Sequence, residues 1–221
     1  HEERGRSLHL GREERRDLSD RAATARLKPG LTLYLIRHGQ TDWNRDARYQ
    51  GQRDIPLNDI GRAQARRQGD ALKARLPGIA SADFVSSPLG RAIETMQLVR
   101  AALGLDIDGY RTDATIRELS YGHWEGELAS DLSAKDPDGV AAKASDPFGW
   151  QPTGGESYAE LQARIAIWIE GLKRDTVAVT HGGVSRVARG AVLGTDPGLV
   201  PFLDVPQDKI LVLRDGVMDW L

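Results

Sequence analysis

Two short apolar segments end in the same way, and this feature restricts the fold more than any other. The run from Leu31 to Ile36 is mostly apolar and is followed at once by Arg37, His38 and Gly39. The run from Thr176 to Thr180 is likewise followed by His181 and Gly182. Short apolar runs of this kind are typical of strands that are buried on both faces of a parallel sheet. The chain is therefore predicted to be an α/β protein with a mostly parallel central sheet.

Helical patterns alternate with the predicted strands. Residues Gly61 to Leu76 carry apolar side chains at helical spacing and end before Pro77 and Gly78. A third strand is predicted from Ala82 to Val85, followed by a helix that begins at Pro88 and runs to about Leu103. This alternation predicts a three-layer α/β/α sandwich, with helices on both faces of the sheet.

The second half of the chain is less regular. Residues Gly109 to Pro152 are rich in Gly, Pro, Asp and Trp, so we expect a long insertion with one or two short helices over the sheet edge. Ser157 and Glu160 form a capping-box pattern for a helix that reaches about Arg174. A further helix is predicted from Val184 to Leu193, and a terminal hairpin from Ile210 to Leu221.

The first 28 residues differ from the rest, because basic and acidic side chains are densely mixed there and apolar ones are few. We expect residues 1–28 to be a charged extension or tail and residues 29–221 to be a single domain. The chain has 221 residues, of which 40% are hydrophobic, and this is enough for one sizeable core.

Composition excludes several function classes. The 30 basic and 32 acidic residues give a net charge of -2, so there is no global field to attract nucleic acid or an anionic membrane. The absence of cysteine excludes thiol nucleophiles and disulfides. We find no apolar stretch of about 18 residues and no apolar signal-peptide core, so a cytoplasmic protein is expected.

The histidine motifs point to one anion site. In open α/β sheets, ligands bind beyond the carboxyl ends of the strands, so His38 and His181 face one crevice if their strands are neighbours. A glycine after each histidine lets backbone amides approach a ligand. Arg91 lies near the start of a helix that follows the third strand, where the helix dipole favours anions. Together with Arg37, these groups form an oxyanion site suited to a phosphoryl group.

Metal binding is the obvious alternative for clustered histidines. The sequence has no closely spaced pair such as H-E-x-x-H, and arginines beside the histidines would repel a cation. We therefore expect no metal and no cofactor. A lone histidine is more often structural than catalytic, but the matching positions of His38 and His181 favour chemistry.

The segment LIRHGQTDWN, from Leu35 to Asn44, closely resembles the signature of the histidine phosphatase superfamily, whose other branch is the cofactor-dependent phosphoglycerate mutases. The resemblance spans nearly everything from Leu31 to Gly194 and implies a phosphoglycerate-mutase-like fold. It continues in the family's order through Arg48 to Gly51, Asp54 to Leu57, Ser86 to Thr95, Arg117 to Leu119, Trp124 to Gly126, Gly154 to Ser157 and Thr180 to Gly182.

The resemblance also implies roles for individual residues. The histidine that matches His38 attacks phosphorus, and the residues that match Arg37, Arg91 and His181 hold the phosphoryl oxygens. The carboxylate that matches Glu118 is the proton donor. The remaining positions implied to line the substrate pocket are Asn44, Gln50, Gly51 and Gly182.

The proposed chemistry sets two conditions on these side chains. Imidazole titrates near 6.5, so His38 offers a bare nitrogen at neutral pH if a neighbouring acceptor fixes its other N–H. Glu118 can protonate a leaving alkoxide and later deprotonate water if partial burial or nearby carboxylates hold it protonated.

The function predicted is hydrolysis of a small phosphorylated metabolite through a phosphohistidine on His38. Mutases usually have serine at the position of Thr41 and a longer basic insertion, whereas Trp124-Glu125-Gly126 is typical of the phosphatases. A mutase stays the alternative, because the same groups would serve it. A non-catalytic phosphate-binding module is a more remote one, since a binder needs neither an attacking base nor a proton donor.

Some questions stay open at this level. His123 stands where phosphatase members often carry an acidic residue, so it either touches substrate or faces solvent. Trp124 and Trp168 are expected to pack rather than to react. The identity of the phosphorylated substrate and the choice between a monomer and a homo-oligomer are not determined by the sequence.

Overall fold

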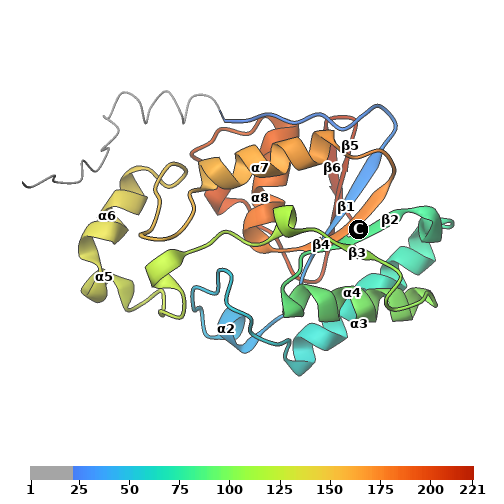
Figure 1. Ribbon diagram of the computed structural model, residues 1–221, viewed down its shortest axis with the longest axis horizontal. Coiled ribbons are helices and arrows are strands. Elements are labelled where there is room, and N and C mark those ends of the chain that lie inside the picture. The colour runs from blue at the N-terminus through green and yellow to red at the C-terminus, as the bar shows by residue number, and fades with distance from the viewer. Residues whose placement is uncertain (1–21) are drawn as a thin grey trace, which may run out of the picture.

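The central sheet has six strands in the computed structural model, which describes residues 22–221. Their order across the sheet is β3-β2-β4-β1-β5-β6 (Figure 1). The first four of these strands run parallel, and the last two form an antiparallel hairpin. Their bounds are β1 (Thr32–Arg37), β2 (Asp83–Ser86), β3 (Arg111–Thr112), β4 (Thr176–Thr180), β5 (Ile210–Arg214) and β6 (Val217–Trp220).

The register of the parallel strands decides which residues meet at their carboxyl ends. Arg37 of β1 lies opposite Thr180 of β4, and Ser86 of β2 lies opposite Val179 of the same strand. The residues that follow these three strands therefore emerge side by side at one edge of the sheet. The mostly parallel sheet predicted from the apolar runs is confirmed.

Two pairs of helices cover the sheet. Helices α3 (Asp59–Arg75) and α4 (Gly90–Leu103) lie on one face, and α7 (Tyr158–Glu170) and α8 (Gly182–Leu193) lie on the other (Figure 1). Each pair closes its own hydrophobic cluster against the strands. Fully burying one leucine or isoleucine contributes about 1.5–3 kcal/mol, so the two clusters hold the layers together. The predicted three-layer sandwich is confirmed.

Helix boundaries follow local capping rather than the apolar pattern alone. The capping box of Ser157 and Glu160 is present, but α7 ends at Glu170, earlier than predicted. Helix α4 begins at Gly90 and not at Pro88, because Leu89 still has extended backbone (φ −72°, ψ 136°). The Asp54 carboxylate accepts a hydrogen bond from the Gly90 amide at 2.9 Å and so caps this helix from a distant loop.

The predicted insertion contains more structure than expected. Strand β3 extends the sheet edge, and its two exposed residues carry no apolar pattern that could have predicted it. Two short helices, α5 (Leu132–Lys135) and α6 (Pro137–Ser145), lie at the left end of Figure 1 beyond α2 (Asp42–Arg45). The expectation of one or two short helices in this insertion is met.

An aromatic cluster holds α6 against the body of the protein. The Lys143 ammonium lies 4.8 Å from the centre of the Tyr49 ring and 5.3 Å from that of Trp124, and it donates a hydrogen bond to the Tyr49 hydroxyl at 2.8 Å. Tyr121 and Trp150 complete this cluster. Cation–π contacts of this kind stabilise by about 0.5–2 kcal/mol each.

The last residues of the predicted tail lie against the domain. Ala25 is buried and donates its amide to the Ala191 carbonyl at 3.0 Å, and Gln162 donates to the Ala23 carbonyl at 3.0 Å. Residues 1–21 lie outside the described residues, so the division of the chain near residue 28 stays a prediction. Within residues 22–221 there is no helix with the length and hydropathy needed to span a membrane.

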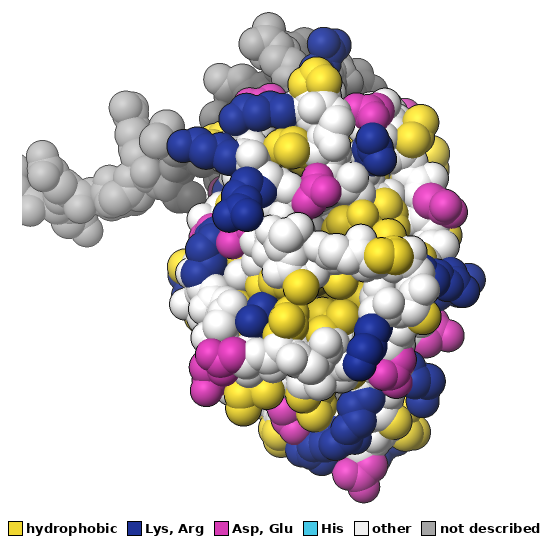
Figure 2. Space-filling view, turned by 90° about the vertical axis from the view of Figure 1, so that its right-hand side faces the viewer, with side chains coloured by type: hydrophobic (Ala, Val, Ile, Leu, Met, Phe, Trp, Pro, Cys, Tyr) yellow, Lys and Arg dark blue, Asp and Glu magenta, His cyan; other side chains and the backbone are white. Residues whose placement is uncertain are grey.

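Surface charge is mixed rather than segregated on one face of the molecule (Figure 2). Figure 2 shows the right-hand side of Figure 1, where basic and acidic side chains are interspersed around a group of hydrophobic ones. This distribution agrees with the net charge of -2. An anion site in this protein therefore depends on local groups.

Candidate active site

Three strand ends bring the candidate catalytic side chains together. His38 follows β1 and donates its amide to the Thr180 carbonyl at 2.9 Å, at the end of β4. The rings of His38 and His181 consequently lie 5.2 Å apart between centres. Arg91, in the first turn of α4, reaches the same point, with its Nε 3.2 Å from Nε2 of His38. Parallel pairing of β1, β4 and β2 is thus the direct cause of the juxtaposition.

The hydrogen bonds of His38 define its tautomer. Nδ1 lies 2.8 Å from the Gly39 carbonyl, which can only accept, so Nδ1 carries the proton. Nε2 is then bare and accepts from the Arg91 Nε–H. Burial holds the pKa of His38 well below 6.5, and the charges of Arg91 and Arg37 lower it further. The ring is therefore neutral at pH 7 and presents an unprotonated nitrogen, the first condition predicted for a nucleophile.

Arg91 ties His38 to the loop that follows α2. Its two terminal nitrogens donate to the carbonyls of Gly51 and Arg53 at 2.7 and 2.6 Å. Burial lowers its pKa to about 10, so it stays charged at pH 7. Gly51 has a positive φ of 50°, and a Cβ there would meet the Glu125 carboxylate at 2.1 Å. Glycine therefore favours this turn, which places the carbonyl that Arg91 binds.

Arg37 and Arg186 lie beside this cluster. Arg37 donates to the Val205 carbonyl at 2.8 Å, while its Nε is buried with no hydrogen-bond partner within residues 22–221. Burial and the charge of Arg186 lower the pKa of Arg37. Arg186 was not singled out from the sequence. It lies one helical turn after Gly182 on α8, and this i, i+4 spacing was the available signal.

His181 is fully buried and only half satisfied. Its Nε2 lies 2.7 Å from the Ser87 hydroxyl, whereas its Nδ1 has no partner in the described part of the chain. Burial, followed by the charge of Arg91, holds the pKa of His181 well below 6.5. A buried polar atom without a partner is costly, so an oxygen of a bound anion would be well accommodated near it.

The two glycines that follow the histidines behave differently. The Gly39 amide donates to the Thr95 hydroxyl at 3.1 Å, and a Cβ at Gly39 would meet the Gly61 carbonyl at 2.2 Å. The expectation that Gly39 offers its amide to a ligand is therefore wrong, because this glycine serves close packing. Gly182 instead begins α8 and lines the cavity described below.

Glu118 is held at the amino end of α8. Its carboxylate accepts from the Leu119 amide at 2.9 Å and from the Gly183 amide at 3.1 and 3.2 Å. These contacts fix the position of the carboxylate at the start of α8. The second predicted condition, a Glu118 kept protonated by partial burial or nearby carboxylates, stays a prediction.

A cavity of about 230 Å³ opens over these groups. Arg91 and His181 are fully buried beside His38 and are not among the residues that line it. Arg48, Tyr49 and Tyr121 do line it, although none was assigned to the site from the sequence. The predicted site residues that line the cavity are Arg37, His38, Asn44, Gln50, Gly51, Glu118 and Gly182.

Comparison with known proteins places this geometry in a family. Residues 33–214 match the family model described as "Histidine phosphatase superfamily (branch 1)". The chain belongs to the histidine phosphatase superfamily. The resemblance noted in the sequence is thereby confirmed.

Relatives of this histidine phosphatase superfamily member carry phosphatase and mutase names. It is 33% identical to the glucosyl-3-phosphoglycerate phosphatase of Mycobacterium tuberculosis over 174 residues, covering 73% of this chain and 74% of the relative. It is 34% identical to phosphoglycerate mutase-like protein 4 of Arabidopsis thaliana over 161 residues, which cover 70% of this chain and 67% of the relative. A solved mycobacterial glucosyl-3-phosphoglycerate phosphatase superposes with a TM-score of 0.68 at 31% identity, covering 82% of this chain and 89% of that one.

His123 and the two tryptophans of this superfamily member make contacts outside the cavity. The His123 ring lies 3.0 Å from the Asp136 carboxylate, at the start of α6, and does not line the cavity. The same carboxylate accepts from the Trp124 indole at 2.7 Å, and Trp168 donates to Asp113 at 3.0 Å. Both tryptophans pack, as predicted, and His123 helps to fix the insertion.

Across residues 22–221 no three His, Asp or Glu side chains gather in a way that could hold a metal ion. His38 and His181 are instead flanked by arginines.

Proposed function

We propose that the protein is a metal-independent phosphomonoesterase of the histidine acid phosphatase type, which hydrolyses a small phosphorylated metabolite through a phosphohistidine on His38. The observation that carries the proposal is the bare Nε2 of His38, set among guanidinium groups and opposite the Glu118 carboxylate in one cavity. The phosphatase names of relatives that match about three quarters of their length support it.

In the first step, Nε2 of His38 attacks phosphorus, the P–N bond forms and the ester P–O bond breaks. The phosphoryl oxygens are held by Arg37, Arg91 and His181, whose charges and donors stabilise the transition state. The Nε–H group of Arg91 donates to the lone pair on Nε2 of His38 that attacks phosphorus. A phosphoryl oxygen therefore has to replace Nε2 as the acceptor for Arg91. Asn44, Gln50, Gly51 and Gly182 line the same cavity and would border the substrate there.

The leaving alkoxide requires a proton, which Glu118 delivers. The substrate can bring this proton when it binds as the monoanion of the phosphate ester, and Glu118 then relays it to the leaving oxygen. The second ionisation of a phosphate ester lies near pH 6, so the monoanion is available at mildly acidic pH. In the second step water attacks phosphorus, its proton passes to Glu118, the P–N bond breaks and inorganic phosphate leaves.

A phosphoglycerate mutase is the alternative that a specific observation favours, namely the mutase-like relative from Arabidopsis thaliana. A mutase would use the same nucleophile but would return the phosphoryl group to a second hydroxyl instead of to water. A non-catalytic phosphate binder is the remaining alternative.

One set of assays separates the three functions. Release of phosphate from p-nitrophenyl phosphate in the presence of EDTA supports the phosphatase and its independence of metal. Conversion of 3-phosphoglycerate to 2-phosphoglycerate that depends on added 2,3-bisphosphoglycerate, without net phosphate release, would select the mutase. Phosphate binding with neither activity would select the binder. A panel of phosphorylated metabolites then identifies the substrate.

A further inference from the structure

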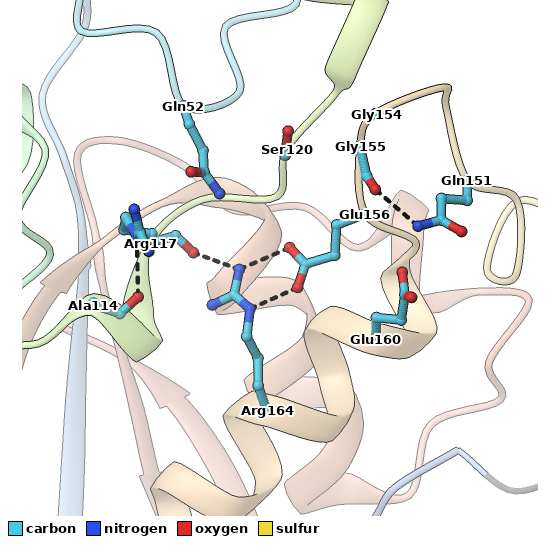
Figure 3. A pocket seen from close by; sticks show the side chains of 10 residues that line it. All are labelled: Gln52, Ala114, Arg117, Ser120, Gln151, Gly154, Gly155, Glu156, Glu160 and Arg164. Carbon is cyan, nitrogen blue, oxygen red and sulfur yellow. Dashed lines mark hydrogen bonds and ion pairs between the residues drawn. The ribbon is translucent and has the colours of Figure 1, made fainter.

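Figure 3 shows a second cavity, of about 400 Å³, which shares one chain segment with the catalytic cavity. Neighbouring residues of one segment line different cavities: Arg117 and Ser120 line this outer one, whereas Glu118 and Tyr121 line the catalytic one. The segment that carries Glu118 is therefore a wall between the two cavities. Contacts that hold this segment from the outer cavity therefore also hold Glu118 in position.

Arg164, from α7, is the central side chain of the outer cavity (Figure 3). The Glu156 carboxylate binds its guanidinium in a two-pronged ion pair, with Nε–Oε1 and Nη2–Oε2 distances of 2.7 and 2.9 Å. Only about a quarter of the Arg164 side chain and a fifth of the Glu156 side chain are exposed. Such a paired geometry is stronger and more directional than a single charged contact.

The remaining N–H groups of the Arg164 guanidinium face the backbone that leads to Glu118. They bind the carbonyls of Thr115 and Arg117, the latter at 2.9 Å, and approach the Glu118 carbonyl at 3.4 Å. Gln52 donates to the same Glu118 carbonyl at 3.0 Å. One guanidinium thus fixes the backbone immediately before Glu118, while the Leu119 and Gly183 amides fix its carboxylate.

We propose that Arg164, oriented by Glu156, is a positioning residue that sets the Glu118 carboxylate in line with the leaving-group oxygen. This inference rests on the proposed function, in which Glu118 is the proton donor. Neither Arg164 nor Glu156 lines the catalytic cavity, so both act through the backbone of the wall. Lysine cannot replace Arg164, because it lacks the planar fork that binds a carboxylate and several carbonyls at once.

Leaving-group chemistry distinguishes this role from a general effect on stability. Benzyl phosphate releases an alkoxide that must be protonated, whereas p-nitrophenyl phosphate of similar size releases a stable phenolate. Displacement of Glu118 therefore slows the first substrate far more than the second. The value of kcat/KM is the quantity to compare, because it reports the steps up to transfer of the phosphoryl group to His38.

The experiment measures kcat/KM of both substrates for Arg164→Gln, Arg164→Lys, Glu156→Gln and Glu118→Gln. Both Arg164 variants are expected to lose on the order of 100-fold on benzyl phosphate, the scale of general acid catalysis, and less than about fivefold on p-nitrophenyl phosphate. Glu156→Gln is expected to show the same selectivity at about tenfold, since its amide still holds Arg164. Arg174→Gln, which removes an exposed donor to the Ser81 carbonyl, is the matched control and leaves both values unchanged.

The outcomes separate the two levels of the proposal. Selective loss in Glu118→Gln together with equal losses on both substrates in the Arg164 variants overturns the positioning role alone. Equal losses in Glu118→Gln overturn the proton-donor assignment and with it the inference. Activity on p-nitrophenyl phosphate reports folding, and if Arg164→Gln does not fold, Glu156→Gln and Arg164→Lys decide by the same ratio.

Discussion

The sheet-edge side of the catalytic cavity and the wall that faces it are built in different ways. His38, His181 and Arg91 directly follow buried parallel strands or open the helix after one, so strand register places them within a few ångströms. The wall belongs to the irregular insertion, and its Glu118 is placed by backbone amides and by Arg164. The positions of the histidines are therefore fixed by secondary structure, whereas the position of Glu118 depends on individual side chains.

The largest expected effect is on the sheet-edge side. His38→Ala removes the attacking nitrogen, and turnover of any accepted phosphomonoester should fall by at least about 10⁴-fold, as is typical when a nucleophile is removed. Steady-state rates measure this loss, and the thermal unfolding midpoint should show an intact fold. Full activity in this variant would place the nucleophile elsewhere.

Arg91→Ala should have the next largest effect. Loss of one preorganised charged donor costs about 2.7–4 kcal/mol of transition-state stabilisation, or a 10²- to 10³-fold lower kcat/KM. The loop carbonyls of Gly51 and Arg53 also lose their donor. Arg91→Lys is the control, and it should recover only part of the loss. A wild-type rate in Arg91→Ala would show that this arginine lies outside the reaction.

Burial of His38 and His181 should make the stability of the protein depend on pH, and Glu118 should not contribute to this dependence. Both folded-state pKa values lie below the ordinary value of 6.5, so below pH 6.5 the unfolded chain binds protons that the folded protein excludes. The free energy of unfolding should therefore decrease as the pH is lowered below 6.5, by about 1.4 kcal/mol per pH unit for each histidine. Urea unfolding at pH 7.0 and 5.5 measures this slope.

The matched variants are His38→Gln and His181→Gln, each of which should flatten the slope by one histidine's share. An unchanged slope in both variants would contradict the burial of neutral rings at the sheet edge. Glu118→Gln provides the comparison from the wall and is expected to leave this histidine-dependent part of the slope in place.

The smallest effect is expected in the insertion. Lys143→Met removes the cation from the cluster of Tyr49, Tyr121, Trp124 and Trp150 and should lower the free energy of unfolding by about 1 kcal/mol. The value of kcat should change less than about twofold, because His38 and Arg91 do not depend on this cluster. Urea unfolding and steady-state kinetics check both numbers. A tenfold loss of kcat would show that the two sides are coupled.

The same contrast explains how far the sequence could predict the molecule. The strands and the meeting of His38 with His181 follow from apolar runs that end in matching motifs, because strand periodicity is a local signal. Strand β3 is two exposed residues long, and the start of α4 depends on Asp54 from another loop, so neither has a local signal.

The site was predictable to a similar extent. The family signature supplied Glu118, but its partners could not be read, since the Gly183 amide reaches it only after α7, α8 and the insertion have packed. The outer contacts of Arg164 likewise depend on tertiary structure. Side chains fixed by register are thus visible in the sequence, and side chains fixed by distant backbone are not.

The most direct test of the central claim is the location of the covalent phosphate. After brief reaction with a turned-over phosphomonoester and an alkaline quench, peptide mass spectrometry should find an acid-labile phosphoryl group on His38. His38→Ala should carry none. A phosphoryl group on another residue, or rapid turnover with no covalent phosphate in rapid-quench samples, would contradict the account.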